Sequence, residues 1–166
     1  MNTLLIILLG VLSRLVPHPA NVTAVGALAV FTGSRYSWIK SLAIMVAVMM
    51  ISDLVLGFHL VMWATYGSLA ISIYLATRLL KKPSLWPVAG VTLTSSVIFY
   101  LVTNFAVWVL PGSMYPKTAA GLLDSYVMAL PFFRNSLIGD ISYTTLFFGG
   151  YKLVTILKYR LRTLHT

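Results

Sequence analysis

The sequence predicts an all-α, polytopic integral membrane protein, and two observations support this prediction. Hydrophobic residues make up 59% of the 166 residues and charged residues only 9%, whereas a soluble domain has about 25% charged residues. The chain also contains apolar stretches of about the twenty residues that a membrane span needs. One of them, Val88–Leu110, has no charged residue. We therefore expect residues 1–166 to form a single transmembrane domain.

The chain is expected to form about six transmembrane helices and one short interfacial helix. Pro17 and Pro19 predict an early break between two short spans, because proline lacks a backbone donor and disfavours helix at the preceding residue. An outer loop over about 111–133 is expected to contain the short helix Thr118–Leu130, capped by Thr118, because its apolar residues have helical spacing. The expected spans are about 3–16, 21–33, 38–57, 60–80, 86–110 and 134–157.

The basic residues predict the orientation of these spans. If the loops alternate between sides, nine of the twelve Lys and Arg residues fall on one side, and only Arg14, Lys117 and Arg134 fall on the other. The positive-inside rule then places both termini in the cytoplasm. A single kinked span over residues 3–33 is the alternative, and it would move the N-terminus outside.

Several function classes do not fit this composition. The net charge of +9 comes from residues at span ends, so we do not expect nucleic acid to bind. The absence of cysteine removes thiolate catalysis and thiolate metal sites. No motif for nucleotide hydrolysis, serine hydrolysis or zinc proteolysis is present. We therefore expect neither an enzyme, nor a bound metal, nor a cofactor.

The unusual polar residues collect on the outer half of the expected layout. Charged residues inside membrane segments are costly and tend to face the bundle interior or an aqueous cavity. Each residue also has a structural explanation: charged residues pair, histidines lie at an exposed rim, and aromatic residues form an interfacial belt. Their convergence nevertheless predicts a small-molecule site. The candidate site residues are Arg14, His18, Asn21, Asp53, His59, Trp63, Tyr66, Asn104, Trp108, Asn135, Asp140 and Tyr143.

Two details of this site are specific enough to test. Arg14 needs a partner within the bundle, and Asp53 is the expected one because both approach the outer face from early spans. Asp140 opens the last span beside Gly139, which permits close backbone approach. The expected pocket lies on the outer half and is bounded by His59, Asn104, Trp108, Asn135 and Asp140.

The blocks Ser13–Ala29, Ser52–His59, Thr103–Trp108 and Pro131–Asp140 resemble a family of small uncharacterised bacterial inner-membrane proteins. The resemblance covers nearly the whole chain. In size and layout that family is similar to the S components of energy-coupling-factor (ECF) vitamin transporters. The resemblance implies a bacterial inner-membrane protein that binds a vitamin-like ligand from outside. It also implies docking on a transmembrane coupling subunit with ATPases. If the ligand were cobalamin, only His18 or His59 could ligate its cobalt, because the chain has no cysteine.

S components dock through small residues on early helices, and this chain has such residues. They could serve docking, or they could pack inside the monomer. They are Ala20, Ala24, Gly26, Ala27, Ala29, Ala43 and Ala47.

Three hypotheses follow for the function. The first is a substrate-binding membrane subunit for uptake of a vitamin-like molecule. The second is a self-sufficient carrier or channel in which Asp53 or Asp140 is a protonatable coupling group. The third is a structural or assembly protein whose polar residues only tie helices together.

Overall fold

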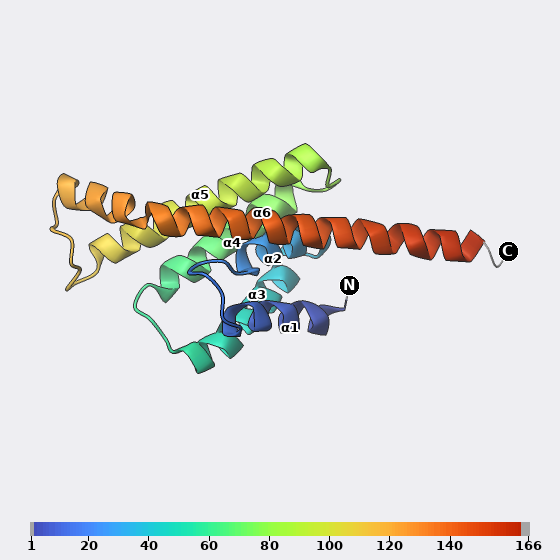
Figure 1. Cartoon of the computed structure of the whole chain (residues 1–166), viewed down its shortest axis with the longest axis horizontal. Coiled ribbons are helices and arrows are strands. Elements are labelled where there is room, and N and C mark those ends of the chain that lie inside the picture. Colours follow the sequence, from blue (N-terminus) through green and yellow to red (C-terminus); the bar gives the residue numbers. More distant parts are fainter. Residues whose placement is uncertain (1, 164–166) are drawn as a thin grey trace.

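The computed structural model describes residues 2–163 and contains six helices and no strand over that range (Figure 1). The all-α prediction is thus confirmed for the described chain. The helices are α1 (Thr3–Leu15), α2 (Val25–Arg35), α3 (Trp38–Leu56), α4 (Met62–Leu79), α5 (Leu85–Val109) and α6 (Ala119–Thr163).

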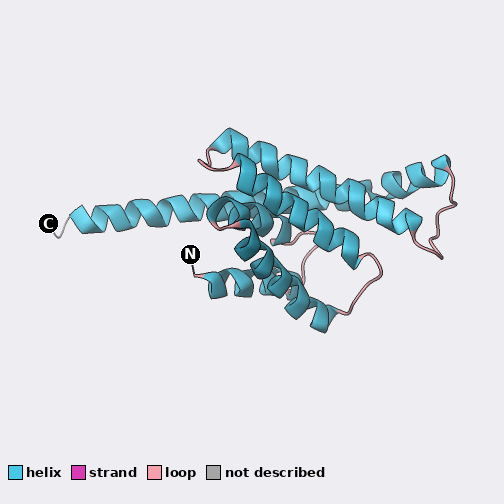
Figure 2. Cartoon of the chain, turned by 180° about the vertical axis from the view of Figure 1, so that it is seen from behind, coloured by secondary structure: helices cyan, strands magenta, loops and turns pink. Residues whose placement is uncertain are grey.

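The short helix α2 lies at the centre of the bundle, where it packs mainly on α4 and α6 and also contacts α1, α3 and α5. Most of its residues are buried, including Leu28, Val30 and Phe31. The α3–α4 and α5–α6 connections lie toward the left in Figure 1, and the N-terminus and the end of α6 lie toward the right; Figure 2 shows the same arrangement from behind.

Local sequence explains where the first helices begin and end. Helix α1 ends at Leu15, two residues before Pro17, as predicted. The loop 16–24 then contains Asn21 with a φ of 65°, a left-handed conformation that asparagine tolerates better than most residues. Two separate helices, rather than one kinked helix, therefore occupy residues 3–33. Helix α3 ends at Leu56, because Gly57 follows with a φ of 92° that is readily accessible only to glycine.

The prediction of a separate interfacial helix before the last span is wrong. Thr118 does cap a helix, since its Oγ1 accepts from the Gly121 N–H at 3.1 Å, but that helix continues through Pro131 to Thr163. Proline has no N–H, so Pro131 leaves the Val127 carbonyl of the preceding turn without its usual intrahelical donor. The helix is nevertheless tied to α5 beside this point, because the Tyr100 hydroxyl donates to the Tyr126 carbonyl at 2.7 Å.

The bundle buries polar side chains within its apolar core and exposes many large apolar side chains on its outside. Ser41, Ser68 and Thr92 are buried, whereas Leu54 and Trp86 are 69% and 82% exposed. Among the described helices, α3 and α5 are long and apolar enough to cross a membrane, with mean hydropathies of 2.1 and 1.7 over their most apolar windows. Helix α1 is apolar but shorter. The six-span layout stays a prediction.

Candidate functional site

A cavity of about 590 Å³ lies among all six helices, beside the α1–α2 and α3–α4 loops. Its rim includes the exposed residues His18, Asn21 and His59, and its buried lining includes Ser72 and Ser95. Small-molecule sites usually enclose about 300–1,000 Å³. The cavity therefore has the size of a small-molecule site. We call it the six-helix cavity.

A network of charged and polar side chains joins three helices beside the six-helix cavity. Arg14 Nη2 of α1 forms a salt bridge of 2.7 Å with Asp53 Oδ1 of α3, whose side chain is fully buried. The Tyr66 hydroxyl of α4 donates to Asp53 Oδ2 at 2.9 Å. Arg14 Nη1 also donates to the Ser52 hydroxyl at 2.5 Å. The predicted pairing of Arg14 with Asp53 is confirmed; Arg14 lines the cavity, whereas Asp53 and Tyr66 lie behind it.

Asp140 of α6 also lines the six-helix cavity, and its carboxylate caps the start of α2. Its Oδ2 accepts from the Ser96 hydroxyl of α5 at 2.6 Å, and its carboxylate also accepts from the Ala27 backbone N–H. A carboxylate is favourable at a helix N-terminus because the first N–H groups lack intrahelical partners. Asp140 therefore links α2, α5 and α6 while lining the six-helix cavity. It lies in the middle of α6, so the expectation that it opens the last helix is wrong.

Two glycines allow α6 and the start of α2 to approach each other. A Cβ atom added to Gly26 would collide with the Asp140 carboxylate. One added to Gly139 would lie 3.3 Å from the Val22 Cα, closer than side chains normally pack. The predicted close backbone approach at Gly139 is thus confirmed.

Ser95 is a lining residue that the sequence reasoning missed. It is 5% exposed, and its hydroxyl has no hydrogen-bond partner among the described residues. A buried polar group without a partner costs about 1–3 kcal/mol, so this hydroxyl is a natural position for a ligand contact. The sequence does carry a signal, because Thr92, Thr94, Ser95 and Ser96 interrupt an otherwise apolar stretch.

Three residues expected at the pocket wall lie outside the six-helix cavity. Asn104 lines a neighbouring hollow of about 120 Å³, and its side-chain amide donates to the Tyr100 carbonyl of its own helix. Trp108 donates to the Pro116 carbonyl. The side-chain amide of Asn135 donates to the Ala20 carbonyl at 3.1 Å and so ties α6 to the α1–α2 loop. Of the predicted wall, His59 and Asp140 line the cavity.

The remaining aromatic candidates also lie away from the cavity lining. Trp63 is 56% exposed, as expected for an interfacial position. Tyr143 stacks on Phe147, with ring centroids 6.1 Å apart. Phe99, which the sequence reasoning did not single out, is the aromatic residue that lines the cavity. The described residues contain no group of three or more side chains suited to hold a metal.

The cavity can offer complementary polar contacts to a small molecule. Arg14 is already neutralised by Asp53, whereas Asp140 forms no salt bridge within residues 2–163. With the Ser95 hydroxyl, the Asp140 carboxylate supplies a site for hydrogen-bond donors or a positive charge. Phe99 and Leu69 supply apolar contact.

Comparison with known proteins finds a protein family that this chain matches. No curated protein matches the chain, and no solved structure matches it. The match covers residues 1–163, nearly the whole sequence. The chain belongs to a family described as Family of unknown function (DUF6580).

Proposed function

We propose that this protein is a membrane-embedded binding subunit that takes up a vitamin-like small molecule through the six-helix cavity. The observation that carries the proposal is the unpartnered Ser95 hydroxyl, buried in the lining of a cavity of about 590 Å³. A protein whose polar residues served only to tie helices together would be expected to satisfy this hydroxyl.

The distribution of polarity supports the membrane part of the proposal. Apolar side chains cover much of the exterior, including Leu54 and Val55 of α3 and Leu85 and Trp86 of α5. Serine and threonine side chains are buried between the helices, where many donate to backbone carbonyls, as Ser68 does to Ala64. Such hydrogen bonds are frequent between and within membrane helices. We propose a multi-pass protein of the bacterial inner membrane with both termini in the cytoplasm.

A separate coupling subunit with ATPases would be the energising partner. The small residues of α2 are not free to dock such a subunit, because Ala24, Ala27 and Ala29 are at most 1% exposed. Ala43 on α3 is exposed, so a docking partner would contact α3 rather than α2.

Mass spectrometry of small molecules released from the purified protein tests the binding proposal. The protein is extracted in mild detergent, washed and denatured, and the released molecules are compared with those from membranes lacking it. We expect one small molecule to be enriched with the wild-type protein.

Variants assign that molecule to the cavity. Ser95→Ala and Asp140→Asn each remove a contact worth about 0.5–3 kcal/mol, so retention should fall by about 2- to 150-fold. Ser68→Ala is the matched control, because Ser68 is equally buried, bonds within its own helix and does not line the cavity. Absence of any enriched molecule, or full retention by both cavity variants, would reject the proposal.

Asp140 favours a second function, a self-sufficient proton-coupled carrier. Its carboxylate lines the cavity and forms no salt bridge within residues 2–163, the arrangement expected of a protonatable coupling group. Proteoliposomes that contain this chain alone distinguish the two functions. Flux driven by an imposed pH gradient, abolished in Asp140→Asn, would favour the carrier; binding without flux would favour the subunit.

A further inference from the structure

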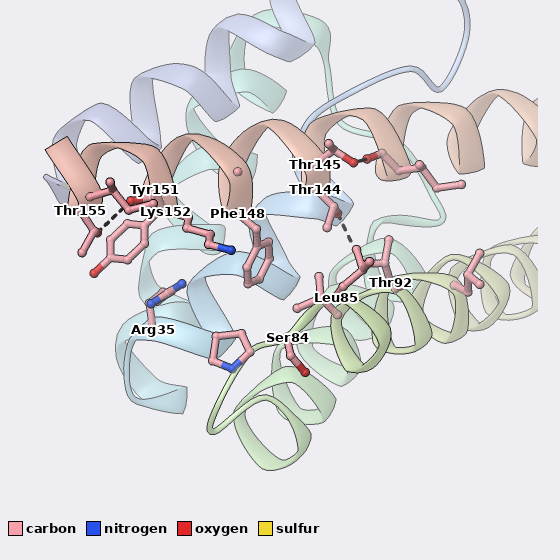
Figure 3. A pocket seen from close by; sticks show the side chains of 17 residues that line it. Arg35, Ser84, Leu85, Thr92, Thr144, Thr145, Phe148, Tyr151, Lys152 and Thr155 are labelled. Carbon is pink, nitrogen blue, oxygen red and sulfur yellow. Dashed lines mark hydrogen bonds between the residues drawn. The ribbon is translucent and has the colours of Figure 1, made fainter.

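A second hollow lies further along α5 and α6 than the six-helix cavity, toward the start of α5 and the end of α6. It encloses about 730 Å³ between the start of α5 and the second half of α6, and it shares no lining residue with the six-helix cavity. Leu85, Val88 and Phe148 contribute to its apolar walls, and Arg35 at the end of α2 lies beside it (Figure 3). We call it the α5–α6 groove.

The groove combines apolar walls with a positive charge that lies over aromatic rings and forms no salt bridge among the described residues. The Arg35 guanidinium lies 3.9 Å from the centroid of the Tyr151 ring, and its buried Nε has no hydrogen-bond partner among the described residues. Lys152 also lines the groove, whereas no carboxylate of the described residues does. In Figure 3, Arg35 points toward Tyr151 and Lys152. The site is therefore built for an anion.

The surroundings of the groove add to this positive potential. Lys81 and Lys82 directly precede Pro83 and Ser84, which line the groove at the start of α5. The Ser84 side chain does not cap α5, so the partial positive charge of this helix start is not offset by its own cap.

We propose that the α5–α6 groove binds one anionic phospholipid. The phosphate contacts Arg35 and Lys152, and an acyl chain lies along the apolar walls between α5 and α6. Charge complementarity selects an anionic headgroup, because basic pockets between transmembrane helices bind such headgroups. The apolar walls select a lipid over free phosphate, which could use only the basic residues. The proposal rests on the membrane placement proposed above but not on any ligand of the six-helix cavity.

Native mass spectrometry of the full chain in detergent, titrated with palmitoyl-oleoyl phosphatidylglycerol, tests this site. Phosphatidylcholine with the same acyl chains serves as a probe without a net negative charge. Glycerol 3-phosphate serves as an anionic probe without acyl chains. We expect a single tight adduct with phosphatidylglycerol alone. Equal binding of phosphatidylcholine, or binding of glycerol 3-phosphate at the same concentration, would overturn the proposal.

Two pairs of variants locate the adduct. Arg35→Gln should weaken it by about fivefold, whereas Arg78→Gln, an arginine that also lies over a tyrosine ring but outside the groove, should not. Gly149 lines the groove and Gly150 does not, and a Cβ at either position meets open space. Gly149→Leu should therefore block the acyl chain and weaken binding by at least about tenfold, while Gly150→Leu binds normally.

The outcome is independent of the vitamin-like ligand. If Arg35→Gln and Gly149→Leu both bind phosphatidylglycerol as tightly as their controls, the groove is not the lipid site, whatever the six-helix cavity contains. If the lipid adduct is lost as expected while no small molecule co-purifies, the lipid site stands and the uptake function fails.

Discussion

Asp53 and Asp140 occupy similar places in the sequence but different places in the structure. Both follow a small residue and precede an aliphatic one, in Ser52-Asp53-Leu54 and Gly139-Asp140-Ile141. Asp53 meets the Arg14 guanidinium and the Tyr66 hydroxyl. Asp140 meets the Ser96 hydroxyl and the Ala27 N–H, both neutral donors.

This difference separates a structural carboxylate from one that is available to a ligand. Asp53 is fully buried, and its charge is offset by Arg14, so removing either partner leaves the other without compensation. Asp140 lines the cavity, its two donors are neutral, and an isosteric amide keeps one oxygen that can accept from either of them. The fold is therefore expected to depend on Asp53, and binding on Asp140.

The largest effect is expected from breaking the Arg14–Asp53 pair. Arg14→Met and Asp53→Asn should each lower the free energy of unfolding by about 3–5 kcal/mol, because each leaves one buried charge unpaired. The double variant should lose less than the sum of the two. Reversible unfolding in mixed detergent micelles measures these values, and strict additivity would show that the two side chains do not interact.

Removing the Tyr66 hydroxyl should have a smaller effect. Tyr66→Phe deletes one hydrogen bond to a charged acceptor and should cost about 1.5–3 kcal/mol of unfolding free energy. The loss should shrink when Asp53 is already Asn. Tyr143→Phe serves as control, because no hydrogen bond to the Tyr143 side chain is formed within residues 2–163; an equal loss in both variants would contradict a specific role for Tyr66.

A methyl group at Gly26 tests the close approach of Asp140 to α2. Gly26→Ala should lower the free energy of unfolding by about 1–3 kcal/mol, because the new Cβ collides with the Asp140 carboxylate. Gly67→Ala should stabilise by up to about 1 kcal/mol, since its Cβ meets open space within a helix. Thermal unfolding of both variants measures the contrast. If Asp140→Ala does not relieve the Gly26→Ala defect, the collision is not its cause.

The helices could be predicted closely where proline and glycine mark their ends. The break before Pro17 and the end of α3 at Gly57 both carry strong local signals. Pro131 misled the prediction, because α6 continues through the proline where it packs on α5 and where Tyr100 of α5 donates to the Tyr126 carbonyl. A contact between distant segments leaves no local pattern in the sequence.

The site was predictable by residue type rather than by geometry. An arginine inside a membrane segment needs a carboxylate, so the pairing with Asp53 followed from electrostatics. The choice of wall residues did not, because Asn104 and Trp108 satisfy their donors within their own helix or the next loop. Conversely, Ser95 became notable only once its hydroxyl proved to lack a partner among the described residues.

The smallest loss of unfolding free energy is expected for a substitution at Asp140. Asp140→Asn keeps the shape of the side chain and an oxygen that accepts from Ser96 or the Ala27 N–H, so it should cost only about 1 kcal/mol of unfolding free energy. The matched substitution Asp53→Asn should cost several times more, because it leaves Arg14 without its partner. Parallel unfolding curves of the two variants give this ratio directly. Equal losses would mean that the Asp140 charge is as important to the fold as that of Asp53, and Asp140 would then be a structural residue rather than a ligand contact.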